Sequence, residues 1–162
     1  MSFKERVPTR LSWRVLLCLA ILSAYLPFLN LRLLPTAGDD KVYVAQALEM
    51  RDAGHLFMQQ LFGEPNYFKG PLHYLLIQLG QAVFGLQLVA IRYMNLIFVL
   101  VAGLSIGAVA QRRLAVAGRE GLALWAGLSC VFSAGTIGHV FASQMEIELL
   151  GFYSLAMLLL EL

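Results

Sequence analysis

Long apolar runs take up most of the chain and constrain its fold more than any other feature. A helix of about 20 apolar residues spans the hydrocarbon core of a bilayer. In addition, 59% of the residues are hydrophobic and 14% are charged, whereas soluble domains are about half apolar and a quarter charged. The sequence therefore predicts an all-α integral membrane protein with about four transmembrane helices. The runs extend from Trp13 to about Leu34, from Leu88 to about Ala110, from Gly121 to about Phe141, and from Leu149 to Leu160.

Basic residues indicate which side of the membrane the ends of these runs face. Short basic segments stay in the cytoplasm under the positive-inside rule. Residues 1–12 are therefore a predicted cytoplasmic N-terminus, and residues 13–34 a predicted first transmembrane helix. No small-residue cleavage site follows this helix, so we expect a retained signal anchor that Pro27 kinks. The basic residues are Lys4, Arg6, Arg10 and Arg14 near the N-terminus, and Arg112, Arg113 and Arg119 in a later loop.

Residues 35–87 form the predicted first outer loop, with two juxtamembrane surface helices at about 39–53 and 71–85. In the first helix, apolar residues recur at helical spacing, an aspartate can cap the N-terminus, and Gly54 suits the C-terminus. The second helix is apolar but about 13 to 15 residues long, which is short for a span. If it does not cross the membrane, the loop after Arg112 falls inside, as its charge requires.

Residues 88–162 hold the predicted transmembrane helices 2–4. Under this topology the segment Ser143–Glu148 returns to the outer face, alongside Asp39. The chain stops about a dozen residues into the last apolar run, short of a full span. We interpret it as a truncated piece of a longer membrane protein.

Carboxylates form the first group of candidate functional residues. Asp39 and Asp40 could accept a proton from a hydroxyl group or bind a metal, or they could simply cap the helix and interact with its dipole. Glu146 and Glu148 precede an apolar run, where acidic residues are costly and are functional candidates by default. They could instead simply lie at the membrane interface, or interact favourably with the dipole at the helix N-terminus.

Basic residues near the outer face form the second group. Lys69 and Arg92 could each bind a lipid phosphate, or they could snorkel from the membrane towards water. The histidines show no metal-ligand spacing, so we predict an interfacial or packing role for each of them. The cysteines lie in apolar runs, so we predict that they are buried packing residues and form neither a disulfide nor a metal site. Five glycines indicate close helix packing. These residues are His55, His73 and His139, Cys18 and Cys130, and Gly103, Gly107, Gly127, Gly135 and Gly138.

The order of several short motifs is more specific than any one of them. The chain resembles the N-terminal part of the protein O-mannosyltransferases and aminoarabinose transferases, which have the GT-C fold (glycosyltransferase family 39/83-like). The resemblance extends from about Leu11 to the end of the chain. The motifs are Asp39-Asp40-x-x-Tyr43, Glu49-Met50, Gly54, Tyr67-Phe68-Lys69-x-Pro71-Leu72-x-Tyr74, Phe84-Gly85 and Ala90-x-Arg92.

The resemblance implies an enzyme that takes a sugar from a polyprenyl-phosphate donor and passes it to a lipid, glycan or protein acceptor. It implies that Asp39 is the general base and Asp40 its neighbour in the acidic pair. It also implies that Glu146 or Glu148 is a second acid. Lys69, with Arg92, would meet the lipid phosphate, and Tyr43 and Tyr67 would lie near the substrate. No nucleotide is implied, and a divalent metal is left open.

The sequence departs from the family pattern in four places. Asp40 replaces the usual glutamate, Gly70 replaces the first proline of Lys-Pro-Pro-Leu, and Gln144 replaces an arginine. The basic residue that often precedes the helix tyrosine is displaced to Lys41, with Val42 in its place. The expected location is the inner (plasma) membrane, as a multi-pass protein with a cytoplasmic N-terminus and a site that faces the periplasm or the outside. The alternative is a non-catalytic membrane subunit or lipid-sugar carrier module, and a transporter fragment is a third interpretation.

Overall fold

The structure is a computed structural model that describes residues 12–29, 40–55, 57–66, 70–86, 88–113, 120–141 and 146–162. This part of the chain is mostly helical, as expected. Its elements are α1 (Trp13–Tyr25), the 3-10 helix η1 (Leu26–Phe28), α2 (Asp40–Asp52), β1 (Gln60–Leu61), β2 (Glu64–Pro65), α3 (Pro71–Phe84), α4 (Leu88–Arg113), α5 (Glu120–Val131), α6 (Ala134–Phe141) and α7 (Glu146–Leu160).

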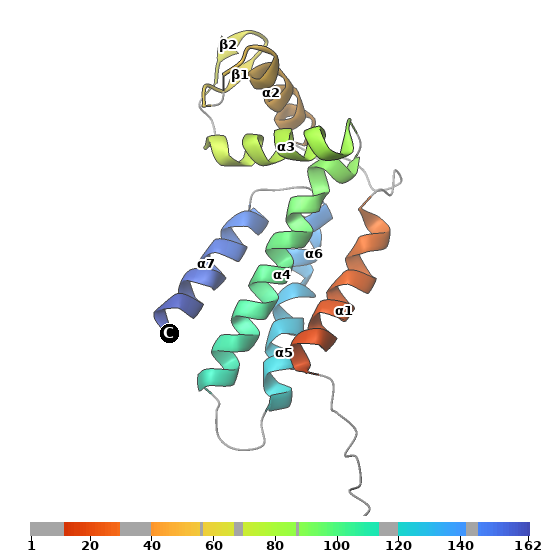
Figure 1. Ribbon diagram of the computed structural model, residues 1–162, viewed down its shortest axis with the longest axis vertical. Helices are drawn as coiled ribbons and strands as arrows, with labels where there is room; N and C mark the ends of the chain where they lie inside the picture. The colour runs from red at the N-terminus through yellow and green to blue at the C-terminus, as the bar shows by residue number, and fades with distance from the viewer. Residues whose placement is uncertain are drawn as a thin grey trace, which may run out of the picture.

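The helices form a bundle with a cap at one end. Helix α4 packs against α5 and α7, and α1 packs against α4 and α5. Figure 1 shows α3 lying across the upper end of this bundle, with α2 and the β1–β2 hairpin above it. The bundle core is made of fully buried aliphatic side chains from these helices, among them Leu17, Ile21, Val99, Val131 and Ile147.

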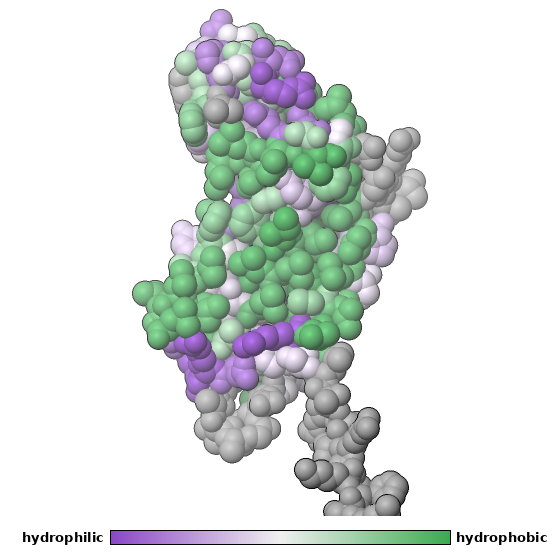
Figure 2. Space-filling view, viewed as in Figure 1, coloured by the Kyte–Doolittle hydropathy of each residue, from purple (hydrophilic) through white to green (hydrophobic). Residues whose placement is uncertain are grey.

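One helix among the described residues is long and apolar enough to cross a membrane, Val89–Arg113. Helices α5 and α6 pass the same test together as a pair bent by 54°, whereas α1 is apolar but shorter. Figure 2 shows hydrophobic side chains over the face of the bundle and hydrophilic ones gathered near both of its ends. An apolar face between two polar ends is what a lipid-facing surface requires.

The first predicted juxtamembrane helix is confirmed as helix α2 and the second as α3. Pro71 stands at the first position of α3, where its fixed φ suits a helix start, and Gly85 ends the helix with φ 70°. Helix α3 packs on α2 through a small cluster of Tyr43, Ala47, Met50, Tyr74 and Ile77. That apolar contact holds α2 and α3 together in the cap. The position of these helices at a membrane surface stays a prediction.

A glycine fixes the crossing of α3 over α4. A Cβ atom added at Gly80 would lie 2.0 Å from the carbonyl oxygen of Ala90 and 2.5 Å from a ring carbon of Tyr93. Only a residue without a side chain allows this approach. Among the glycines predicted to pack closely, Gly103, Gly107 and Gly127 do so, but Gly135 and Gly138 have no atom within 4 Å of an added Cβ, so that prediction is wrong for these two.

Two expectations about the first and third runs need correction. Helix α1 ends at Tyr25 and continues as η1, which contains Pro27, instead of running as one kinked helix; residues 30–39 lie outside the described part. The third run breaks between α5 and α6. The freed carbonyl groups there are satisfied, because the Tyr25 hydroxyl donates to Val131 and the Thr136 hydroxyl donates to Cys130.

The all-α expectation is wrong in one detail, a small β-hairpin between α2 and α3. Its strands pair antiparallel, with Leu61 opposite Glu64. The carboxylate of Glu49 accepts hydrogen bonds from the backbone N–H groups of Phe62 and Gly63, at 3.0 and 3.1 Å. Phe62 has φ 56°, an uncommon value for a residue with a side chain. The glutamate of α2 therefore secures the turn of the hairpin.

Candidate functional site

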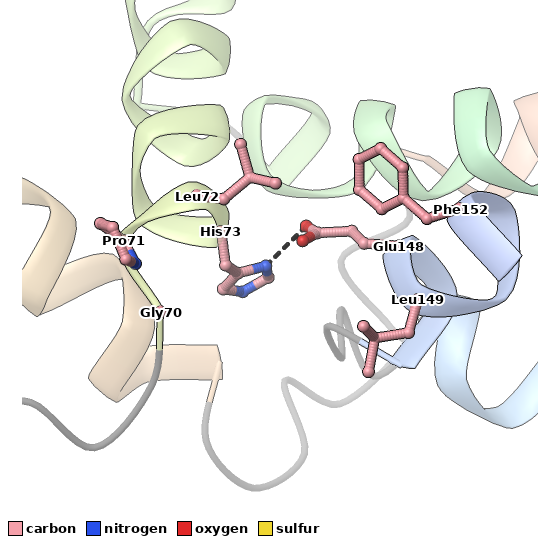
Figure 3. A pocket seen from close by; sticks show the side chains of 7 residues that line it. All are labelled: Gly70, Pro71, Leu72, His73, Glu148, Leu149 and Phe152. Carbon is pink, nitrogen blue, oxygen red and sulfur yellow. Dashed lines mark hydrogen bonds and ion pairs between the residues drawn. The ribbon is translucent and has the colours of Figure 1, made fainter. Parts of the chain in front are cut away.

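A buried ion pair joins the first turn of α3 to the first turn of α7. The Nδ1 atom of His73 lies 2.7 Å from Oε1 of Glu148. The two side chains are 5% and 7% exposed. Figure 3 shows the carboxylate and the imidazole facing each other, with Leu72 and Phe152 on one side of the pair and Leu149 on the other.

The pair lines a cavity of about 190 Å³. One wall is the start of α3, and the other is the first two turns of α7. Apart from the pair, the side chains in these walls are apolar, so the cavity joins one ionic contact to a hydrophobic lining. The lining residues are Gly70, Pro71, Leu72, His73, Glu148, Leu149 and Phe152.

Local sequence explains why these two side chains meet. Pro71 starts α3, which places His73 in its first turn. Glu148 lies in the first turn of α7, where the helix dipole favours a negative charge. Helix α7 packs along α4, and α3 crosses the end of α4. The two helix N-termini are therefore brought together at one end of the bundle.

Helix α2 completes the surroundings of His73. The ring of Tyr43 meets the imidazole edge-on, with centroids 4.9 Å apart. The hydroxyl of the neighbouring Tyr74 donates to Oε1 of Gln46 at 2.8 Å. Tyr43, which the resemblance places near the substrate, thus contacts the residue that Glu148 holds.

The second ring nitrogen of His73 has an open hydrogen-bonding capacity. Its Nε2 atom is buried and has no hydrogen-bond partner in the part of the chain that the structure describes. A buried polar atom without a partner costs about 1–3 kcal/mol. If Nδ1 carries the proton and donates to the carboxylate, Nε2 is an acceptor. In that tautomer the protein encloses one hydrogen-bond acceptor next to the contact with Glu148.

The structure separates the two glutamates that the sequence left as alternatives. Glu148 is buried, whereas Glu146 is exposed. Glu148 is therefore the one that belongs to the cavity.

Arg92 is 2% exposed. Its side chain therefore does not snorkel to the surface, and the snorkelling role that the sequence left open for Arg92 is excluded.

Several predicted site residues cannot be placed. Asp39, Tyr67 and Lys69 lie outside the described residues, and Asp40 begins α2 but its side chain is not described. Gly70, the residue after Lys69, lines the cavity. Roles for these four residues stay predictions. The described residues contain no group of three or more histidine, cysteine, aspartate or glutamate side chains that could hold a metal ion.

His73 is the residue that sequence reasoning missed, since it was assigned an interfacial or packing role. A signal was available, because His73 lies inside the motif Lys69-x-Pro71-Leu72-x-Tyr74. Its partner lies 75 positions away, and a single sequence does not show such a pairing.

Comparisons with known proteins were made for the whole chain. No family model matches it, and neither a curated protein nor a solved structure matches it. The relation to GT-C glycosyltransferases therefore rests on the motifs quoted above.

Proposed function

We propose that the protein is a multi-pass membrane glycosyltransferase that moves a sugar from a polyprenyl-phosphate donor to an acceptor on the outer face. The observation that carries the proposal is the buried ion pair of His73 and Glu148. It lies in an apolar cavity that starts at Gly70, directly after Lys69. His73, from the motif Lys69-x-Pro71-Leu72-x-Tyr74, thus meets Glu148, one of the two candidates for the second acid.

The membrane topology belongs to the same proposal. Helices α1, α4 and α7 and the bent pair α5–α6 are the four transmembrane segments. Among the described residues, α4 is the one unbroken helix with the length for a full crossing, and α5 and α6 have it together. The bundle end that carries Arg112 and Arg113 faces the cytoplasm, as the positive-inside rule requires. The cap made by α2, α3 and the hairpin then faces the periplasm or the outside, with the cavity at its base.

The chemistry is assigned to the charged residues that the resemblance implies. Transfer breaks the bond between the sugar C1 and a phosphate oxygen, and the electron pair leaves with the phosphate. Lys69 and Arg92 stabilise the negative charge that grows there. A hydroxyl oxygen of the acceptor bonds to C1, and Asp39 takes the hydroxyl proton. Asp40 supports Asp39, and a divalent metal would assist the phosphate if one binds.

The cavity suits a donor that is part lipid and part polar. Leu72, Leu149 and Phe152 offer apolar contact, and Glu148 with His73 offers a polar one.

The test measures transfer of labelled sugar from polyprenyl-phosphate donors in membranes that contain the protein. General-base catalysis is worth roughly 10²- to 10⁴-fold, so Asp39→Asn should lower the rate by at least about 10²-fold. Asp52→Asn is the matched control, since Asp52 is an exposed aspartate at the other end of α2. Transfer by Asp39→Asn at the wild-type rate would show that this mechanism is wrong.

A second candidate function is a non-catalytic lipid-sugar carrier or subunit. It is favoured by the ion pair itself, because the carboxylate of Glu148 is already engaged by His73. This function predicts tight binding of the donor without turnover. Binding and transfer measured on the same membranes separate the two functions.

A further inference from the structure

Positive charge is concentrated at the end of the bundle opposite the cap, which we call the basic end. Figure 1 shows that α1 and α5 start there and that α4 and α7 end there. The sequence segments 1–14 and 111–120 contain the start of α1 and the connection from α4 to α5. They hold seven basic and two acidic residues, a net charge of +5. The whole chain has a net charge of +2, so the remaining residues have a net charge of −3. The basic end therefore suits a negatively charged partner.

Trp13, the first residue of α1, is held in place by α4 at this end. Its indole N–H donates to Oε1 of Gln111 at 3.1 Å. A Cβ atom added at Gly107, one turn earlier in α4, would lie 2.5 Å from a ring carbon of Trp13. The ring therefore lies directly against the backbone of α4. Tryptophan side chains favour the headgroup layer of a membrane, where the ring meets apolar groups and the N–H meets polar ones.

Arg14 lies over this fixed ring. Its guanidinium carbon is 5.5 Å from the ring centroid of Trp13, within the range of a cation–π contact. The arginine is exposed, so the contact positions the charge and leaves it accessible. A guanidinium group carries five N–H donors in a planar fork that matches the oxygens of a phosphate. Arg14 is therefore placed to bind an anion that lies beside Trp13.

The other side chains of the basic end extend the same pattern. The carboxylate of Glu161 accepts from Arg113, and its backbone carbonyl accepts from Arg112. Both arginines are exposed, and one carboxylate does not neutralise two of them. Trp125 is 66% exposed and lies five residues after the start of α5, about 8 Å along its axis. Both tryptophans of the chain thus lie near exposed arginines, as interfacial anchors do.

Resting on the membrane location in the proposed function, and not on sugar transfer, we propose that the basic end binds the headgroups of anionic phospholipids. Arg14, held over Trp13, is the defined contact and donates to the phosphate oxygens. The indole ring lies beside the upper part of the acyl chains, and Arg112 adds positive charge at the same end. A zwitterionic lipid has the same phosphate with a compensating cation, so the basic end prefers lipids with a net negative charge.

Trp13 itself reports which lipid lies next to Arg14. In a Trp125→Phe protein Trp13 is the remaining tryptophan, and a lipid brominated in the upper part of an acyl chain quenches its fluorescence on contact. The protein is reconstituted into mixed bilayers of phosphatidylglycerol and phosphatidylcholine, with bromine first on one lipid and then on the other. One basic residue near an anionic surface contributes about 5-fold to binding, so phosphatidylglycerol should bind beside Trp13 about 5-fold more tightly. Salt at about 1 M should reduce this preference.

Matched variants locate the preference. Arg14→Gln in the same background should bring the ratio of the two affinities towards 1. Arg51→Gln, which alters an exposed arginine of α2, should keep the wild-type ratio. A reporter for the cap combines Trp13→Phe and Trp125→Phe with Leu86→Trp, because Leu86 is 73% exposed after α3. This reporter should show no preference for phosphatidylglycerol.

The remaining outcomes separate this inference from the proposed function. Equal quenching of Trp13 by the two lipids would overturn the lipid preference and leave the membrane location in place. A preference that survives Arg14→Gln, or one of equal size at the Leu86→Trp reporter, would overturn the contact assigned to Arg14. If brominated lipids quench the Leu86→Trp reporter but not Trp13, the inference alone falls. If they quench neither, the membrane location falls with it.

Discussion

His73 and Glu148 form a buried ion pair, Nδ1 to Oε1 at 2.7 Å, across 75 positions of sequence. The contact links the cap helix α3 to α7, the last helix described in the bundle. Because the two side chains are only 5% and 7% exposed, each depends on the other far more than the partners of an exposed pair do.

The first prediction concerns what each half of this pair contributes to stability. His73→Leu leaves a buried carboxylate without a donor and should lower the free energy of unfolding by about 3–5 kcal/mol. Glu148→Leu leaves the Nδ1–H group of His73 unpaired and should cost about 1–3 kcal/mol. The double variant should be more stable than His73→Leu alone.

Unfolding in detergent micelles by denaturant measures all three variants. Arg51→Leu is the control, because its partner Asp52 is exposed and such pairs contribute about 0–1 kcal/mol. If His73→Leu and Arg51→Leu lowered the free energy of unfolding equally, the burial of the pair would be contradicted.

A second prediction concerns the crossing of α3 and α4. Gly80→Ala introduces a methyl group 2.0 Å from the Ala90 carbonyl oxygen, so the helices must separate. Overpacking of this kind costs about 1–3 kcal/mol. Gly138→Ala in α6 has open space around it and should be neutral or stabilising by up to about 1 kcal/mol. Thermal unfolding of both variants in the same detergent checks this, and a Gly80→Ala protein as stable as Gly138→Ala would rule out the close contact.

A third prediction concerns acid sensitivity at the opposite end of the bundle. The hydrogen bond from Arg113, together with the charges of Arg113 and Arg112, holds the pKa of the Glu161 carboxyl below its ordinary value. A lowered folded-state pKa means that the contribution is present above the unfolded-state pKa and is lost as the pH falls through the folded-state pKa. Because the pair is exposed, salt should weaken it.

Unfolding midpoints measured from about pH 6 to about pH 3 bracket the carboxyl range. Glu161→Gln should show a shallower acid decline than the wild type, and about 1 M salt should reduce the difference. Asp52→Asn serves as the control for an exposed carboxylate elsewhere. Parallel pH curves for Glu161→Gln and the wild type would disprove the role of this contact.

The fourth prediction concerns topology. In a protein with Cys18→Ser and Cys130→Ser, a cysteine introduced by Glu64→Cys should react with a membrane-impermeant maleimide in intact cells. One introduced by Gly121→Cys should react only after the cells are opened. Both positions are exposed in the structure. The reverse pattern would show that the cap lies in the cytoplasm, and labelling of both in intact cells would show that α3 crosses the membrane.

Helices with strong end signals were predictable from the sequence. Helix α2 starts within one residue of the predicted position and ends one residue before it, because an aspartate and Gly54 mark its ends. Pro71 and Gly85 mark α3 in the same way. Arg112 and Arg113 predicted the end of α4 to within a few residues.

Features made by tertiary contacts were not predictable. The bend between α5 and α6 has no proline, and it is held by hydroxyl groups, one of them from Tyr25, which is 106 positions from Val131. The choice of Glu148 over Glu146 depends on which side of α7 meets α3. The β1–β2 turn depends on a carboxylate from α2, and its strands of two residues each are too short to show a periodicity.

The bend in the α5–α6 segment has a consequence for how the site could change over time. Asn95 donates to the carbonyl oxygen of Val140 at 2.8 Å, so α6 is fastened to α4 just before the chain turns towards α7. Helix α6 also contacts α7, the helix that carries Glu148. A substitution at Thr136 removes the hydroxyl group that satisfies the Cys130 carbonyl, and it would alter the break while every cavity residue stayed the same. Ligand preference could thus drift through positions that never touch a ligand.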